Sequence, residues 1–232
     1  MMKSINQILT WHFLSRFLLL AVLGSLLSCA SVDKKKGKQA KGQKDGKGEQ
    51  IELTAEDAVE PFVLIPNPYT PGSVPGPAKV EYAKVKELMS AKKWAQAKGL
   101  LTLMVETYPA LAGPYINLGI AHQSLGELED AEKAFKFAIE TNPQNLNAYS
   151  QLGYLYREQG RFDESEAIYL KALAIWPHHL PSVKNLGILY DLYMGRLEEA
   201  LPYYRLTQNL LGGEDRTLRG WIADLKRRLN TQ

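Results

Sequence analysis

Apolar residues between about positions 78 and 229 recur every three or four residues, which is the spacing of one buried face of an α-helix. The pattern also repeats on a longer scale. Gly119, Gly153 and Gly187 are evenly spaced along the chain, and each follows a leucine inside an apolar stretch. A set of prolines repeats the same step. A fixed period as long as the separation between Gly119 and Gly153 indicates stacked helical units rather than one globular core.

Glycine and proline residues divide each period into two helices. Gly126 and Gly160 are expected to form the turn inside a unit, because glycine readily adopts the left-handed conformation that ends a helix. Pro143 and Pro177 are expected to end the second helix, which proline cannot continue. The pattern therefore predicts one helix pair per unit. Small Gly and Ala residues let the two helices approach closely, and aromatic residues fill the spaces between units.

The two ends of the array are less regular. Residues 77–109 have the length of a unit but match the repeat poorly, so we expect a degenerate first unit. In the fourth unit Gly195 falls one position late, which indicates an insertion in the first helix or its loop, and Pro202 is expected in the first turns of the second helix. A last amphipathic segment should cover the final apolar face. The predicted units are 78–111, 112–145, 146–179 and 180–213, followed by a capping helix over 215–229.

The repeated positions resemble those of tetratricopeptide repeats, in which W-x₂-L-G-x₂-Y is followed by A-x₃-F and then a proline. The matching residues are Tyr115, Leu118, Gly119, His122, Ala131, Phe135, Ala138 and Pro143 in unit two, Tyr149, Leu152, Gly153, Tyr156, Ser165, Tyr169, Ala172 and Pro177 in unit three, and Val183, Leu186, Gly187, Tyr190, Ala200 and Tyr204 in unit four. The resemblance implies an all-α fold: a right-handed α-solenoid of antiparallel helix pairs with a C-terminal capping helix.

In that family the first helix of each unit lines a concave groove that takes extended or helical segments of protein partners. The resemblance therefore implies a groove for a protein partner, or for a second copy of the chain. The positions that correspond are Tyr82, Lys86, Ile116, Asn117, Ile120, Gln123, Asn147, Ser150, Tyr154, Arg157, Lys184, Asn185 and Ile188. Some family members hold a partner's terminal carboxylate at such positions. Asn117 and Asn185 suit that role, or they simply fix the backbone.

The N-terminal segment has the pattern of a targeting sequence. Lys3 and Arg16 precede an apolar run from Phe17 to Leu27, which is too short to cross a bilayer as a helix. The run ends in Leu-Leu-Ser-Cys29, which resembles the lipobox of bacterial lipoproteins. The resemblance implies cleavage before Cys29 and acylation of that cysteine, which anchors the chain to a membrane. Ala30, in the place of an inner-membrane retention signal, implies the outer membrane, facing the periplasm. The alternatives are an ordinary cleaved signal and an uncleaved anchor.

Residues 29–77 are predicted to be a tether. The stretch 33–49 holds seven lysines and four glycines with almost no apolar residue, so it cannot offset the entropy of ordering. Its lysines either attract anionic lipid or wall polymer, or form a solvated spacer. Prolines then make the chain extended and stiff. The apolar cluster Phe62 to Ile65 is expected to pack on the first unit.

Charge and composition argue against several function classes. The net charge is +3, of which about two charges lie in the leader, so nucleic acid is not the expected partner. After the leader the histidines are His122, predicted to pack in the core, and the pair His178–His179 in a turn, without acidic or cysteine residues at metal-ligand spacing. Cys29 is expected to be acylated and no phosphate-binding loop is present. We therefore expect no enzyme activity, no cofactor and no metal.

Two functions remain open at this point. The first is a non-catalytic interaction scaffold or adaptor on the outer membrane, which assists assembly of an envelope complex of the pilus-secretin or protease-adaptor type. The second is a structural lipoprotein that associates with peptidoglycan or anionic lipid through its lysine-rich tether and uses its repeats for self-association. The two differ in whether the groove or the tether carries the binding.

Overall fold

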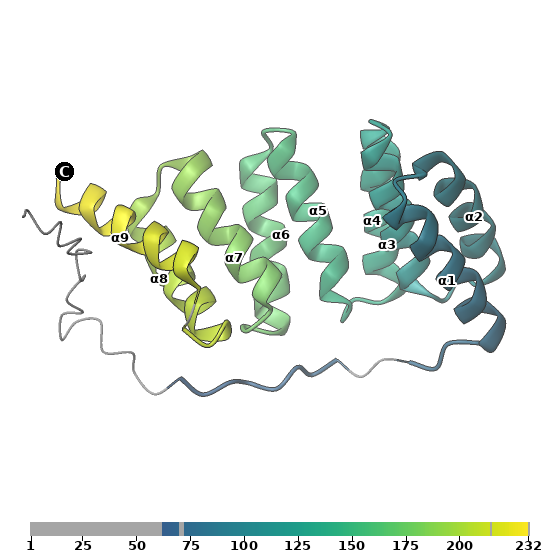
Figure 1. The fold of residues 1–232 in the computed structure, drawn as a ribbon, viewed down its shortest axis with the longest axis horizontal. Coiled ribbons are helices and arrows are strands. Elements are labelled where there is room, and N and C mark those ends of the chain that lie inside the picture. The colour runs from purple at the N-terminus through teal and green to yellow at the C-terminus, as the bar shows by residue number, and fades with distance from the viewer. Residues whose placement is uncertain (1–61, 70–71, 214, 232) are drawn as a thin grey trace, which may run out of the picture. The chain divides into compact units, whose positions relative to one another are not determined.

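The computed structural model describes residues 62–69, 72–213 and 215–231. Consecutive helices in this part of the chain pack side by side as pairs (Figure 1). They are α1 (Gly76–Ser90), α2 (Trp94–Thr107), α3 (Ala112–Ser124), α4 (Leu128–Thr141), α5 (Leu146–Glu158), α6 (Phe162–Ile175), α7 (Leu180–Ile188), η2 (Leu189–Met194), α8 (Leu197–Leu210) and α9 (Arg216–Asn230). The predicted all-α array of helix pairs is confirmed. The leader, Cys29 and the lysine-rich stretch lie outside the described residues.

The turns inside the units contain residues with left-handed backbone. Gly126 has a φ of 80° and Gly160 a φ of 74°, as the sequence predicts. Lys92, one repeat period before Gly126, has a φ of 55° and takes the same role in the first unit. A side chain costs more than glycine in this conformation. The first unit therefore keeps the geometry of the turn although it has lost the glycine.

Close packing of glycine on an aromatic ring recurs in the core. Phe135 and Tyr169 are fully buried, and their rings lie directly against Gly119 and Gly153 of the preceding helix. A β-carbon at Gly119 would lie 2.5 Å from Phe135, and one at Gly153 would lie 2.6 Å from Tyr169. Gly187 stands in the same relation to the ring of the fourth unit. The regularly spaced glycines therefore mark the places where the first helix of a unit packs directly on an aromatic ring of the second helix.

The extra residue of the fourth unit is absorbed by a π-helix. Residues 189–194 form η2, which continues α7 and ends at Gly195 with a φ of 66°. In the third unit the Arg161 amide donates to the Tyr156 carbonyl at 2.9 Å, whereas in the fourth unit the Arg196 amide donates to the Tyr190 carbonyl at 2.8 Å, one residue further along. Each hydrogen bond of a π-helix spans one residue more than a hydrogen bond of an α-helix. The insertion therefore leaves the helix pair intact.

The last two helices complete the array. Pro202 is the sixth residue of α8, so it lies in the first two turns of the helix as predicted, but beyond the four residues whose amides have no partner within the helix. The final helix α9 begins after Asp215, whose side chain accepts a hydrogen bond from the Leu218 amide at 2.8 Å and so caps the helix. Leu218, Ile222 and Leu225 are buried, and α9 packs on α8. This helix covers the apolar end of the array.

The segment 62–69 lies elsewhere than predicted. We expected the cluster Phe62 to Ile65 to pack on the first unit, but it contacts the turn between α6 and α7, where Trp176 and His178 hold it. The prediction was wrong because it assumed that a segment packs on its nearest neighbour in sequence. The extended chain instead runs past the turns at the ends of the units (Figure 1).

Candidate functional site

The predicted groove positions lie on the first helices of the four units, α1, α3, α5 and α7. Contacts between α3 and α5 and between α5 and α7 join these helices into one face. Among the predicted positions Lys86, Asn147 and Lys184 are exposed, Tyr82, Asn117, Ile120, Gln123, Tyr154, Asn185 and Ile188 are partly buried, and Ile116, Ser150 and Arg157 are buried. The face therefore combines polar side chains with half-buried apolar ones.

Two tyrosine rings enclose the buried Arg157 of α5. The guanidinium carbon lies 4.8 Å from the ring centre of Tyr154 and 5.2 Å from that of Tyr193, which η2 contributes. Stacking on aromatic faces favours a cation that has lost its water. Tyr193 also packs on Phe162, with ring centres 5.4 Å apart. The sequence indicated Tyr154 and Arg157 but missed Tyr193, because only the insertion in the fourth unit turns this residue toward α5.

The polar partners of Arg157 are few. Its Nη2 donates to Glu158 at 3.3 Å, while Nε and Nη1 are buried and make no protein hydrogen bond within the described part of the chain. Tyr193, which contacts it, is 41% exposed, and the preceding residue in the chain, Leu192, is 67% exposed. Aromatic residues and arginine dominate the energetic centres of protein interfaces. The arginine and its two tyrosines are therefore the strongest candidate for a partner contact on this face, and we call Tyr154, Arg157 and Tyr193 the arginine cage.

Two of the predicted positions contact each other in the first and second units. Asn117 donates a hydrogen bond from its side-chain amide to the Tyr82 hydroxyl and another to the Gly113 carbonyl at 2.9 Å. Burial raises the pKa of Tyr82, and the bond from Asn117 opposes this shift. Of the two roles left open for Asn117, fixing the chain is the one that its contacts fulfil. Lys184 lies 5.8 Å from the centre of the Trp221 ring of α9, so it faces the capping helix.

Comparison with known families assigns the repeats. Residues 113–145 and 144–212 match two models, both described as tetratricopeptide repeat. The chain is a tetratricopeptide repeat protein. Repeats of this class generally mediate protein–protein interaction, and proteins built from them are generally non-catalytic scaffolds. No curated protein sequence matches the chain.

Solved structures show the same fold. A thermophilic TPR protein of Thermus thermophilus is 27% identical, with a TM-score of 0.57 over 64% of this chain and 80% of that one. Pseudomonas aeruginosa pilF is 20% identical, with a TM-score of 0.60 over 66% of this chain and 69% of that one. MamA of Desulfovibrio magneticus RS-1 is 16% identical, with a TM-score of 0.56 over 68% of this chain and 88% of that one. The last two likenesses concern the fold alone.

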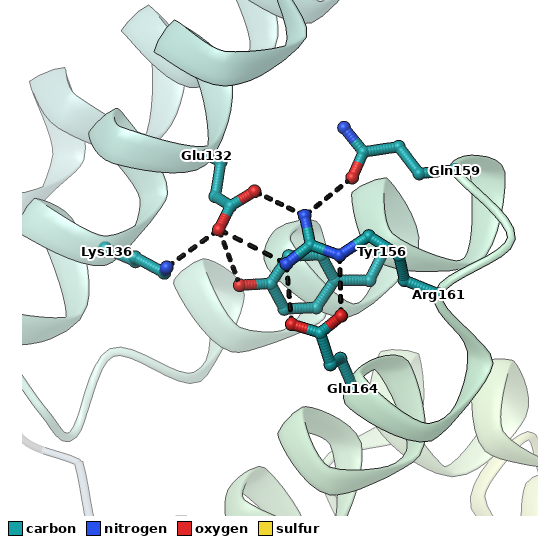
Figure 2. Close-up of polar contacts among 6 residues, drawn as sticks. All are labelled: Glu132, Lys136, Tyr156, Gln159, Arg161 and Glu164. Carbon is teal, nitrogen blue, oxygen red and sulfur yellow. Dashed lines mark hydrogen bonds and ion pairs between the residues drawn. The ribbon is translucent and has the colours of Figure 1, made fainter.

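Ion pairs join consecutive tetratricopeptide units. Between units two and three, Glu132 of α4 accepts hydrogen bonds from Arg161 at 2.5 Å, Lys136 at 2.7 Å and Tyr156 at 3.0 Å (Figure 2). Arg161 also pairs with Glu164 and stacks on Tyr156, 4.0 Å from the ring centre. Burial alone would raise the pKa of Glu132, but the three donors outweigh it and lower the pKa to about 2. The carboxylate therefore stays charged at neutral pH.

The same arrangement returns between units three and four. Arg196 pairs with Glu166 at 2.9 Å and stacks on Tyr190, 4.4 Å from the ring centre, and the Tyr190 hydroxyl donates to Glu166 at 2.6 Å. Arg196 also pairs with Glu199 at the start of α8. An acidic residue on one unit and an arginine on the next therefore form a junction that repeats along the array.

The first junction of the array has its charges reversed. Lys98 stands one repeat period before Glu132, and Glu127 stands one period before Arg161, so the base now belongs to the earlier unit. The Lys98 ammonium lies 2.7 Å from Glu127, and His122, in place of a tyrosine, lies 2.6 Å from the same carboxylate. His122 was predicted to pack in the core, and it is instead partly buried with a polar partner. These hydrogen bonds lower the pKa of Glu127.

A second surface feature lies beside the middle junction. An open cleft of about 430 Å³ lies between α4 and α6 and has Leu152 of α5 in its floor. Ile139 and Ile168 add apolar walls, and Lys136 and Lys171 stand among the charged residues at its rim. The sequence did not point to this cleft, because it arises from the spacing of two second helices.

The described residues contain no group of three potential metal ligands among His, Cys, Asp and Glu. His179 is buried at the start of α7, where its Nδ1 lies 2.9 Å from the Ser182 hydroxyl, and burial lowers its pKa to about 4. The neighbouring His178 contacts the extended segment. Over the same part of the chain no helix has the length and apolar character needed to cross a bilayer.

Proposed function

We propose that this chain is a non-catalytic adaptor that binds a protein partner on the face of α1, α3, α5 and α7, with the arginine cage as its centre. The observation that carries the proposal is a buried arginine that stacks on two tyrosine rings on the face that joins the first helices. An exposed Tyr193 and a half-buried Tyr154 offer the amphipathic rings that interfaces favour. The lipobox resemblance adds an outer-membrane location facing the periplasm, where the partner belongs to an envelope complex.

We expect variants of the cage to lose the partner. Tyr193→Ala removes a 41% exposed ring and should leave the melting temperature nearly unchanged, while capture of crosslinked partners from membranes falls at least about tenfold. The double change Tyr154→Ala with Arg157→Ala should lose capture as well. Lys171→Ala is the matched control. This residue of α6 lies at the rim of the cleft between α4 and α6, away from the cage, so the variant should retain capture. Capture can be measured by mass spectrometry after crosslinking.

Two results would count against the groove. Equal recovery of the same partners by the wild type and the cage variants would remove the cage from the interface. Intact capture in the cage variants, together with loss of capture after deletion of residues 33–49, would favour the alternative in which the lysine-rich tether carries the binding.

We also propose that Cys29 carries the membrane anchor. Cys29→Ser should abolish incorporation of labelled palmitate and release the chain from the membrane fraction, because the two or more acyl chains carried by this cysteine provide the stable hydrophobic anchor. Ser28→Ala is a control that keeps the cysteine and should keep the label. Unchanged palmitate incorporation in the Cys29→Ser chain would show that the lipobox resemblance misleads.

A further inference from the structure

Side chains of the turn between α6 and α7 bind the main chain of a distant part of the protein. The indole nitrogen of Trp176 donates to the Ile65 carbonyl at 2.8 Å, and the Ile65 amide donates to Nδ1 of His178 at 2.8 Å. Two side chains of one turn thus satisfy both main-chain polar groups of a residue more than 100 positions away. Main-chain hydrogen bonds of this kind give affinity for an extended peptide without reading its side chain at that position.

One side chain of the segment adds to these bonds. The Phe62 ring packs on the His178 ring with 5.0 Å between their centres, tilted by 44°. Val63 and Leu64, by contrast, are 78% and 58% exposed and contribute little. The turn therefore recognises the ring of Phe62 and, three residues later, the main-chain groups of Ile65.

The segment is prepared for this conformation by its own sequence. Pro66 follows Ile65, and a residue before proline is restricted to extended backbone. The Asn67 side chain accepts a hydrogen bond from the Tyr69 amide at 2.9 Å, which closes a local turn. A segment that is already extended loses less entropy when it binds. The contacts at Ile65 and Phe62 can therefore hold it although most of its surface is exposed.

We propose that the α6–α7 turn is a recognition site for an extended peptide, and that residues 62–69 of this chain are its occupant. The segment binds as a separable ligand rather than as part of the helical core, since its contacts are with turns. Phe62 and Ile65 contact the α6–α7 turn, and the Tyr69 hydroxyl accepts a hydrogen bond at 3.5 Å from Asn142 at the end of α4. Phe62, at the start of the segment, therefore lies beside the third and fourth units, far along the sequence from α1. This inference is independent of the proposed partner on the first helices.

Amide hydrogen exchange of the full chain in detergent micelles tests the site. Phe62→Ala and His178→Ala should each accelerate exchange of the Ile65 amide roughly fivefold to tenfold, because each removes a contact that holds the segment. Trp176→Phe keeps an aromatic ring, removes the indole donor and should have a similar effect. Leu64→Ala is the matched control in the same segment and should exchange like the wild type. The melting temperature should change little in the segment variants.

Two outcomes would overturn the proposal. If Phe62→Ala, Leu64→Ala and the wild type exchange alike at Ile65, the segment is not held at the turn. If protection of the Ile65 amide falls on dilution together with the molecular mass in solution, the occupant is the segment of a second copy. A supporting result is a Trp176 indole signal that shifts in Phe62→Ala at every protein concentration, with unchanged mass.

Discussion

Gly153→Ala is expected to unfold the chain at temperatures where the wild type is stable. A β-carbon at this position would lie 2.6, 2.8 and 2.9 Å from three atoms of the Tyr169 ring, which is fully buried. Overpacking of this kind costs about 3 kcal/mol. That corresponds to a fall in melting temperature of roughly 6–12 °C for a domain of this size. Thermal unfolding followed by circular dichroism measures the change.

A second glycine provides the control for this prediction. Gly99 lies inside α2, and a β-carbon there would have no neighbouring atom within 4 Å, so Gly99→Ala should raise stability by up to about 1 kcal/mol through helix propensity. The double variant Gly153→Ala with Tyr169→Leu should recover part of the loss, because the smaller side chain makes room. A Gly153→Ala chain as stable as the wild type would contradict the close approach of α5 and α6.

Removal of the central carboxylate at the middle junction is the second large effect that we expect. Glu132→Ala leaves Arg161, Lys136 and the Tyr156 hydroxyl without their shared acceptor, which should cost about 2–3 kcal/mol at pH 7. Glu129→Ala, at an exposed position of the same helix, should change the free energy of unfolding by less than about 0.5 kcal/mol. Urea unfolding measures both.

The effect of Glu132 should depend on pH with a definite sign. Folding lowers the pKa of its carboxyl from an ordinary value near 4.5 to about 2, so the folded state binds this proton less readily than the unfolded state. The stabilisation is therefore complete above about pH 5 and is lost as the pH falls toward 2. The side chain of Glu132→Gln cannot titrate. The difference in the free energy of unfolding between this variant and the wild type should therefore narrow as the pH falls from about 5 toward 2. A gap that stays constant from pH 7 to pH 2.5 would contradict the lowered pKa.

The repeating parts of the fold were predictable because the same physical requirement recurs in each unit. The step from Gly119 to Gly153 to Gly187 reports a helix contact that tolerates no side chain, and the turn at Gly126 requires a positive φ. The first unit was harder to recognise, since Lys92 adopts the same backbone without the glycine that would signal it.

The candidate site was predictable only in part. Periodicity placed Tyr154 and Arg157 on the same helix, three residues apart, and they do contact each other. Tyr193 was not predicted, because a one-residue insertion does not reveal which side chain a π-helix will turn toward α5. The docking of residues 62–65 at the turn between α6 and α7 was beyond sequence reasoning for another reason. Its hydrogen bonds join the side chains of Trp176 and His178 to the main-chain groups of Ile65, more than 100 positions away, and main-chain groups leave no mark on the sequence at Ile65.

The reversed charges at the first junction limit how such a gene can grow by duplication. A copy of the second unit inserted after itself would bring Glu132 against a second Glu127, two like charges where the array needs opposite ones. A copy of the third unit would bring Glu166 against a second Arg161, which is an attractive pair. Lengthening of this lineage is therefore expected to proceed by copies of the third unit, while the first two units remain together as a fixed beginning.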